Sequence, residues 1–211
     1  MDFIFDGSLV LYLPLHELDG ASIVSKEAYS HLCTVTGSLW APRGRNFDGL
    51  DDVISCGSSA VLKPNDPLTV ATWEIWINPY SPLSGATDFF RKGNTYEIGS
   101  SNLSTGRFGM YDFGGLGWLL TAAAYVAATK WQHLGWVKNG TSLHLYYNGD
   151  LKETKVCSAS WAATSDALLV GNNEAGTSPF RGIAGEVRIY RRALTPLEIH
   201  HNYLATKWRY R

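Results

Sequence analysis

Hydrophobic and polar residues alternate along much of the chain, at the two-residue period of a β-strand. Residues 72–77 show the pattern clearly, because Trp73, Ile75 and Ile77 fall on one face of an extended segment. Trp76 falls on the opposite face of the same segment. A tryptophan on each face is typical of an inner strand that is covered on both sides.

Segments of this kind recur between clusters of Gly, Asn, Asp and Pro, and helical periodicity is scarce before about residue 195. Short β-branched and aromatic segments separated by turn residues are typical of an antiparallel sandwich or barrel. Turn sequences such as "VKNGTS" and "YNGD" supply the Gly and Asn that tight hairpins need. The pattern predicts ten strands: Leu9–Leu15, Val53–Ser55, Thr69–Ile77, Tyr96–Ser100, Arg107–Phe113, Gly117–Thr121, Trp131–Lys138, Ser142–Asn148, Leu168–Gly171 and Gly185–Arg191.

One stretch, "RALTPLEIHHNYLATKWRY", has the signature of a helix. Thr195 suits the N-cap, Pro196 suits the first helical position, and Glu198 completes a capping box. We therefore predict a closing helix over residues 195–205. Spacings of three and four residues predict the side chains that pack on the body of the protein, namely Leu197, His200 or His201, and Leu204.

A basic tail, residues 206–211, follows the predicted helix. It carries Lys207, Arg209 and Arg211. Two interpretations are open, because the tail is either a solvated end or an arm that contacts a partner.

The bulk composition is sufficient for one sizeable core and argues against several classes of partner. The 211 residues are 45% hydrophobic and no linker-like stretch divides them, so we predict a single domain over residues 1–211. Lys and Arg (18) nearly balance Asp and Glu (19), so we expect no nucleic-acid partner. No run approaches the roughly 18–20 apolar residues of a membrane-spanning helix, so we expect no membrane insertion.

The first residues, "MDFIFDGSLVLYLPLHE", have neither a basic n-region nor a small-residue cleavage site. We expect no signal peptide, and hence a protein made in the cytoplasm.

The three cysteines, Cys33, Cys56 and Cys157, are an odd number at wide spacing, unlike a disulfide framework or paired metal ligands. We expect buried thiols, with one Cys33–Cys56 bridge as the alternative.

Five stretches follow one another in an informative order. They are "GSLVLYLPLHE", "GRNFDGLDDVISCG", "TWEIWINP", "WQHLGWVKNGTSLHLYYNGDL" and "GEVRIYRRALTPLEI". Each alone is unspecific, but together they cover nearly the whole chain and resemble the laminin-G-like, concanavalin A-like lectin/glucanase family of jelly-roll domains. The resemblance implies an all-β fold: an antiparallel β-sandwich jelly roll of two curved sheets with a concave face, around one core, with a short C-terminal helix.

Some jelly-roll relatives cleave glycans with closely spaced carboxylates on one strand, often Glu-x-Asp-x-x-Glu. Retaining glycosidases need two carboxyl groups roughly 5 Å apart. No strand here offers such a set, because Glu74 is alone on its strand. Asp48, Asp51 and Asp52 fall in a Gly-containing turn, where Asp commonly bonds to its own backbone. We therefore expect no enzymatic activity.

Two further polar positions have structural interpretations. His133 follows the family's Trp-x-His position, where we expect a packed, hydrogen-bonded side chain rather than a catalytic base. Glu186 and Arg188 share one face of the strand "EVRIY", which predicts an ion pair.

The resemblance also implies a structural Ca²⁺ site near the first and closing strands, made of the oxygen ligands that Ca²⁺ prefers. Glu17 and Asp19 are the candidate ligands at the first end. At the other end Gly185 replaces the family's usual Asp, which leaves Glu186, whose side chain points to the other face. We therefore treat Ca²⁺ as an optional ligand and expect no required cofactor.

Glycan binding is the function that the resemblance implies. Sugars stack on aromatic rings and hydrogen-bond to planar polar side chains in shallow clefts. The segments "RKGNTYE" and "RFGMYDFGGLGWLL" offer such groups, with glycines that let a ligand approach, while packing in the core or rim is the alternative for each ring. The candidate glycan-binding residues are Arg91, Asn94, Tyr96, Arg107, Tyr111, Asp112 and Trp118.

Two functions of different classes remain open. The first is a non-catalytic lectin-like module, serving glycan binding or adhesion in a phage or virus particle or in a cell-surface assembly. The second is a purely structural virion or decoration protein that self-assembles without binding glycans, since plain domains of this family recur in phage and virion surface proteins. Both allow protein partners or a homo-oligomer, but only the first predicts a carbohydrate ligand. A glycoside hydrolase is the third alternative.

Overall fold

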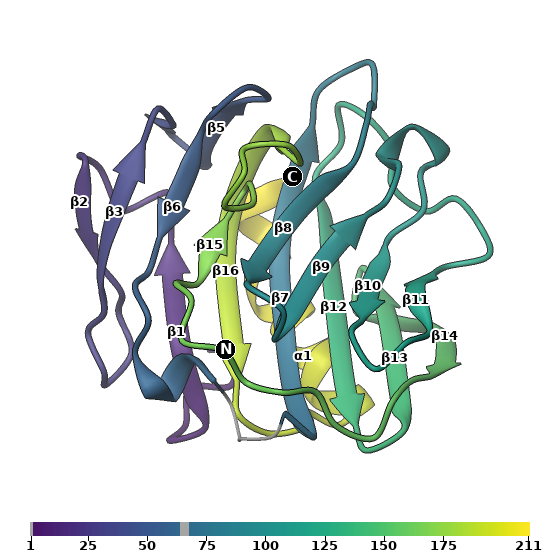
Figure 1. Cartoon of the computed structure of the whole chain (residues 1–211). Coiled ribbons are helices and arrows are strands. Elements are labelled where there is room, and N and C mark those ends of the chain that lie inside the picture. The colour runs from purple at the N-terminus through teal and green to yellow at the C-terminus, as the bar shows by residue number, and fades with distance from the viewer. Residues whose placement is uncertain (1, 64–67) are drawn as a thin grey trace.

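The computed structural model describes residues 2–63 and 68–211 and contains two antiparallel β-sheets packed face to face, with one α-helix on the outside (Figure 1). Sheet A contains, in spatial order, β14 (Asp150–Val156), β13 (Ser142–Tyr147), β12 (Gln132–Asn139), β7 (Val70–Pro79), β16 (Arg181–Tyr190), β5 (Gly44–Asp48) and β4 (Leu39–Ala41), and β1 (Leu9–Pro14) also pairs with β16. Sheet B contains β11 (Gly117–Leu120), β10 (Gly109–Asp112), β9 (Tyr96–Ser100), β8 (Thr87–Lys92), β15 (Leu169–Val170), β6 (Val53–Ser55), β3 (Leu32–Thr36) and β2 (Ser22–Val24). The predicted all-β sandwich is confirmed.

The main core lies between the two sheets and follows the predicted alternation. In β7, Trp73, Ile75 and Ile77 point inward and are buried in this core. Trp136 of β12 lies among aromatic rings of sheet B, with its ring centroid 6.1 Å from that of Phe89. Burying large aromatic and branched side chains from both sheets is the main source of stability in a sandwich of this kind.

Each of the ten predicted strands coincides with an observed one, although several boundaries move by a few residues. The closing strand β16 begins at Arg181, earlier than predicted, and has an irregular register between Ala184 and Val187. Six strands were not predicted, namely β2, β3, β4, β5, β8 and β14. In β14 the sequence "DLKETKV" has no apolar face, because this edge strand is largely open to solvent.

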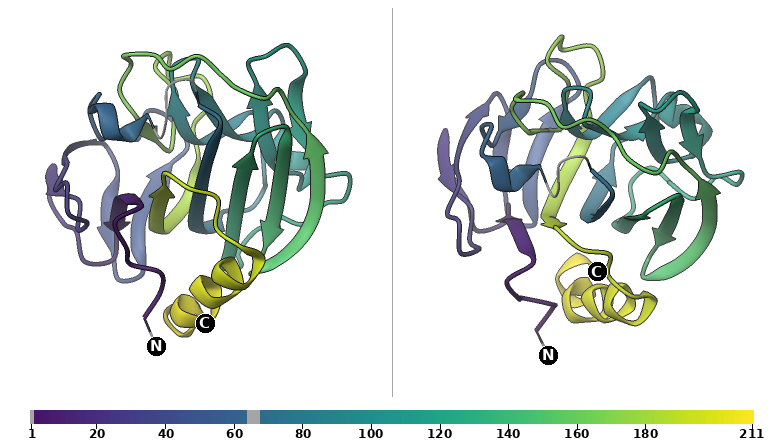
Figure 2. Two further views of the ribbon diagram at one scale, coloured as in Figure 1. Left: turned by 90° about the horizontal axis from the view of Figure 1, so that it is seen from below. Right: turned by 60° about the horizontal axis from the view of Figure 1, so that its bottom comes forward.

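Helix α1 (Pro196–Thr206) packs on the outer face of sheet A (Figure 2). Its start is as predicted, since Thr195 caps the helix and a capping box with Glu198 is formed. The predicted packing face is wrong, because Leu197 is 82% exposed. The buried residues are Ile199, Asn202 and Thr206, which lie one or two positions further along the helix than the residues selected by periodicity.

The basic tail is not a solvated end. It forms the 3₁₀ turn η3 (Lys207–Tyr210), which lies against sheet A, with the ring of Tyr210 stacked on Trp76 at a centroid distance of 4.5 Å.

Two further 3₁₀ turns are η1 (Ala60–Leu62) and η2 (Leu103–Thr105). Cys33, Cys56 and Cys157 are buried free thiols. No helix in the described part of the chain combines the length and apolar character needed to cross a bilayer.

Candidate functional site

The two ends of the chain lie side by side on the outer face of sheet A (Figure 2). The N-terminal segment, residues 2–8, is fixed at its centre by Ile4. The Ile4 N–H donates to Asn202 Oδ1 of helix α1 at 2.7 Å, and the Tyr190 hydroxyl of β16 donates to the Ile4 carbonyl at 2.9 Å. These bonds give the aromatic side chains on either side of Ile4 defined positions.

A buried network of charged side chains lies between sheet A and helix α1. Its centre is Glu74, whose carboxylate lies 3.3 Å from His133 Nε2 and 3.5 Å from an Arg188 guanidinium nitrogen. Asn202 of the helix donates to the same carboxylate at 2.7 Å. Burial lowers the pKa of His133 despite the neighbouring Glu74, so the imidazole is neutral near pH 7. His133 is thus a packed part of the fold, out of reach of a ligand.

Glu186 is the second carboxylate of this network, and two guanidinium groups neutralise it. Arg188 donates to it at 2.7 Å, which confirms the ion pair predicted within the strand. Arg209 of the tail pairs with its other oxygen. A buried carboxylate held in this way is not free to bind Ca²⁺, which corrects the prediction that Glu186 is a metal ligand.

The other predicted metal ligands, Glu17 and Asp19, make local contacts. Glu17 is exposed and contacts His16 at 3.2 Å, and Asp19 accepts a hydrogen bond from the neighbouring Gly20 N–H at 2.7 Å. In the described part of the chain, one group of three acidic residues has ligand oxygens within 4.8 Å of one another, namely Asp48, Asp51 and Asp52. Its hydrogen bonds are those of the predicted turn, since Asp52 accepts from the Asp48 N–H and Asp48 accepts from the Leu50 N–H.

Gly185 takes part in docking the tail. A Cβ atom at this position would lie 2.5 Å from the ring of Tyr210, so a side chain there and the docked tail exclude each other. The Asp that the family resemblance implies at position 185 would have no room here, because the ring of Tyr210 occupies that space.

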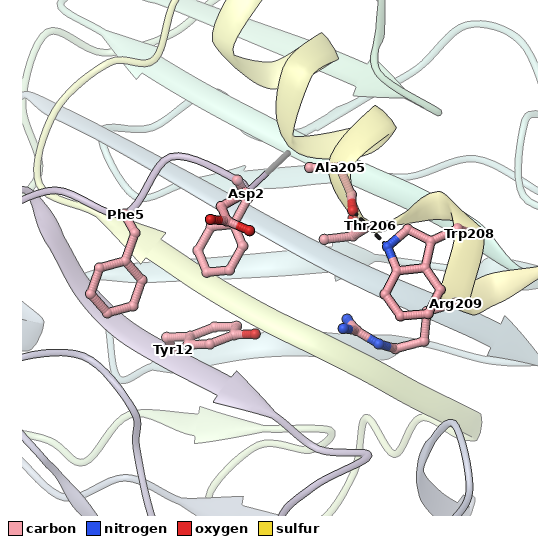
Figure 3. Close-up of a pocket in the computed structure, with 8 residues that line it drawn as sticks. Asp2, Phe5, Tyr12, Ala205, Thr206, Trp208 and Arg209 are labelled. Atoms are coloured by element: carbon pink, nitrogen blue, oxygen red, sulfur yellow. Dashed lines mark hydrogen bonds between the residues drawn. The ribbon is translucent and has the colours of Figure 1, made fainter.

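A pocket of about 600 Å³ opens between the N-terminal segment and the tail (Figure 3). We name it the terminal pocket. Its lining comes from the N-terminal segment, β1, the end of α1 and η3, and consists of Asp2, Phe3, Phe5, Tyr12, Ala205, Thr206, Trp208 and Arg209.

Aromatic rings dominate the terminal pocket. Phe3 lies 4.8 Å from Tyr12 between ring centroids, and Phe5 lies 6.3 Å from Tyr12. Trp208 is at the other end of the pocket, with the Arg209 guanidinium 4.8 Å from its ring centroid (Figure 3). Phe5 is 58% exposed and Trp208 is 62% exposed, so both rings offer an open face to a ligand.

Three of the seven predicted glycan-binding residues come together on the outer face of sheet B. Cross-strand register places Arg91, Glu97, Tyr111 and Trp118 in one row, which we name the sheet B row. Arg91 pairs with Glu97, and the rings of Tyr111 and Trp118 lie 5.8 Å apart. The row therefore has two partly exposed rings beside an ion pair.

The remaining predicted residues do not join this row. Tyr96 is buried in the core against Trp73, and Asp112 is buried and accepts from the Ser158 N–H at 2.6 Å. Strand alternation turns both inward, so the prediction that they bind a glycan is wrong. Asn94 is exposed in the turn between β8 and β9, and Arg107 donates to the carbonyl of Thr121.

The terminal pocket was missed because its residues come from the two ends of the chain. Phe3 and Phe5 alternate around Ile4 ahead of the first predicted strand, and Trp208 stands in the stretch interpreted as a basic tail. The available signal was the concentration of aromatic residues at both ends. It became interpretable only once the hydrogen bonds of Ile4 brought those ends together.

The chain belongs to the concanavalin A-like lectin/glucanases superfamily, because the sequence profile of that family matches residues 48–200. Among curated proteins, none matches the chain significantly.

Solved structures show the same fold at low sequence identity. A sialidase from Trypanosoma rangeli, in complex with 2,3-difluorosialic acid, aligns with a TM-score of 0.74 and 14% identity over 97% of this chain and 34% of its own. Domain 4 of AbnA, an arabinanase from Geobacillus stearothermophilus, in complex with arabinotriose, aligns with a TM-score of 0.68 and 17% identity over 92% of this chain and 97% of its own. The receptor-binding domain of botulinum neurotoxin mosaic serotype C/D aligns with a TM-score of 0.71 and 14% identity. The chain thus spans about a third of the sialidase and about half of the toxin domain.

Proposed function

We propose that the chain is a non-catalytic carbohydrate-binding module and that its ligand occupies the terminal pocket. The observation that carries the proposal is the pair of open aromatic faces, Phe5 and Trp208, at opposite ends of that pocket. The apolar C–H face of a sugar ring packs on such surfaces. Asp2 and Arg209 add polar groups of the kind that orient a ligand by hydrogen bonding.

The comparisons support carbohydrate binding as the general function. The superfamily is one of lectins and glucanases, and the arabinanase domain that aligns over nearly its full length was solved with a bound oligosaccharide. Those identities are low, so the location of the ligand in this chain rests on its own pocket.

Features of the acidic residues support binding without cleavage. Of the described residues that line the terminal pocket, one is a carboxylate, Asp2, whereas glycoside hydrolysis normally needs a pair. Glu74 and Glu186 lie beneath helix α1 and the tail, where they pair with guanidinium groups. Neither is placed to act as an acid or a nucleophile on a ligand in the pocket.

The test is a glycan array followed by calorimetric titration of the strongest ligand. The Trp208→Ala variant is suitable because the ring is exposed and its N–H donates only to the nearby Ala205 carbonyl. Trp118→Ala in the sheet B row is the matched control. We expect Trp208→Ala to weaken binding by about tenfold or more, and Trp118→Ala to leave it unchanged.

Two outcomes overturn this proposal. A blank array for the intact protein would reject carbohydrate binding. Loss of binding in Trp118→Ala with full binding in Trp208→Ala would move the site to the sheet B row. Incubation of the bound glycan with the protein should release no product.

A second candidate function, self-assembly or incorporation into a particle such as a virion, is favoured by a separate surface. Val24 and Leu32 face each other across β2 and β3 and are both exposed, and Leu39 and Trp40 are exposed on edge strand β4. Exposed apolar side chains on edge strands favour association with another chain. Light scattering should then show an oligomer that Leu32→Asp dissociates. A monomer at high concentration would contradict this function.

A further inference from the structure

The terminal pocket has a neighbour with which it shares a residue. A second pocket, of about 440 Å³, lies on the other side of Phe5 and reaches Glu27 and Tyr29. Phe5 lines both pockets, so the two pockets are neighbours at this residue. Tyr29 at the far end is 37% exposed and stacks on His31 with ring planes 15° apart. Three partly open aromatic side chains, Tyr29, Phe5 and Trp208, are therefore distributed along the two pockets.

The residues around the second pocket are held in place by the fold. Asp6 accepts a hydrogen bond from the Ser8 N–H at 2.8 Å and pairs with Arg192 at 2.9 Å. The buried Glu27 accepts a hydrogen bond from the Tyr12 N–H of β1 at 2.7 Å. The floor is thus fixed before any ligand binds, which limits the conformational entropy lost on binding.

The charges of the two pockets favour an uncharged ligand. Acidic side chains are spread along both pockets, at Asp2, Asp6 and Glu27, and Arg209 is the one basic side chain among their described lining residues. Arg209 is already paired with Glu186. Asp6 is likewise paired with Arg192, so the exposed carboxylate of Asp2 is the charge that opposes a carboxylated or sulfated sugar, and no unpaired cation among the described lining residues offsets it.

We propose that the two pockets form one groove, which binds a linear, neutral oligosaccharide across Phe5, with Trp208 and Tyr29 as its end platforms. Each ring packs against one sugar of the chain, and the carboxylates of Asp2 and Asp6 accept hydrogen bonds from sugar hydroxyl groups. This inference rests on the proposed carbohydrate-binding function and assigns its ligand class.

The experiment is a titration with a ladder of neutral oligosaccharides of increasing length, derived from the strongest glycan in the array. Affinity should rise with length until the groove is filled. Tyr29→Ala should weaken binding of the longest member by about tenfold while leaving the shortest unchanged. Tyr29→Phe keeps the ring and should bind as the unmodified protein does, and thermal unfolding of both variants checks that the fold is intact.

The outcomes separate this inference from the proposed function. If the shortest member binds as tightly as the longest, and Tyr29→Ala has no effect while Trp208→Ala abolishes binding, the extended groove is wrong and the terminal pocket stands. If acidic oligosaccharides of the same length bind equally well, the neutral ligand class is wrong. If no member of the ladder binds, the carbohydrate-binding function itself fails.

Discussion

The outer faces of the two sheets differ in what covers them. On sheet A, helix α1 and the tail bury Glu74, His133 and Arg188 beneath them. On sheet B, the row from Arg91 to Trp118 stays partly open to solvent. Both faces carry aromatic and charged residues, but only on sheet A do the chain ends form walls around exposed rings.

Exposed aromatic residues alone do not make a binding site. The sheet B row presents its rings on the surface of a sheet, whereas the terminal pocket holds Phe5 and Trp208 at two ends of one recess. A recess buries more of a ligand's surface than a row of side chains does.

The largest expected effect comes from removing Arg188. Arg188→Ala leaves the carboxylates of Glu74 and Glu186 buried without this partner, and we expect it to lower the free energy of unfolding by about 3–5 kcal/mol. Arg91→Ala, which breaks an ion pair of the sheet B row, should cost about 1 kcal/mol, because solvent reaches that pair. Denaturant unfolding of both variants measures the difference. Equal losses would contradict the contrast between a covered and an open face.

Docking of the tail is tested at Gly185. Gly185→Asp places a side chain against the ring of Tyr210, and we expect about 1–3 kcal/mol of destabilisation, with faster proteolysis of the tail. Gly7→Asp is the control, because a side chain there meets no atom within 4 Å. Adding Tyr210→Ala should reduce the penalty of the Asp, as measured by a double-mutant cycle. If the losses of stability from Gly185→Asp and Tyr210→Ala simply add, the ring of Tyr210 does not occupy the space beside residue 185.

The contribution of a buried carboxylate in sheet B, Asp88, to the free energy of unfolding should depend on pH in the opposite way to that of a paired carboxylate. Burial raises the pKa of Asp88 to about 7, with nearby Arg91 offsetting only part of the effect. The folded protein thus holds the proton more tightly than the unfolded chain. Asp88 contributes stability below about pH 4 that is lost as the pH rises through about 7.

Asp88→Asn should flatten this dependence and raise the stability at pH 8 by roughly 1–3 kcal/mol. Unfolding by denaturant across pH 4–8 measures it, with Asp150→Asn on the exposed edge strand β14 as the control. A variant that is less stable than the unmodified protein at every pH would mean that the carboxylate makes favourable contacts in its charged form.

The smallest expected effect is that of Trp118→Ala on stability. Trp118 is partly buried on the surface of sheet B, with its ring against the edge of Tyr111, and we expect a loss of about 0.5–1 kcal/mol. Thermal unfolding measures the change. A loss as large as that of Arg188→Ala would mean that the sheet B row is part of the core.

Much of the fold could be predicted because it follows from the alternation of apolar and polar residues within single elements. The inward residues of β7, the cap of α1 and the pair Glu186–Arg188 all follow from spacing within one element. Strand β14 could not be predicted, because an edge strand open to solvent needs no apolar face.

The site was less predictable, because it depends on contacts between distant parts of the chain. Tyr111 and Trp118 were identified because one short segment contains both rings, and the hairpin of β10 and β11 brings them together. Tyr96 was misassigned, because composition does not tell which side of a strand faces the core. Phe5 and Trp208 are brought to one pocket by bonds between the chain ends that no local pattern encodes.

The indole N–H resonances of Trp208 and Trp118 show which of the two surfaces binds the ligand. The protein has eight tryptophans, and Trp208→Phe and Trp118→Phe assign the two relevant signals in a ¹H–¹⁵N spectrum. On titration with the preferred oligosaccharide, the Trp208 signal should shift in proportion to saturation while the Trp118 signal stays in place. A shift of Trp118 with no change at Trp208 would contradict the assignment of the ligand site to the terminal pocket.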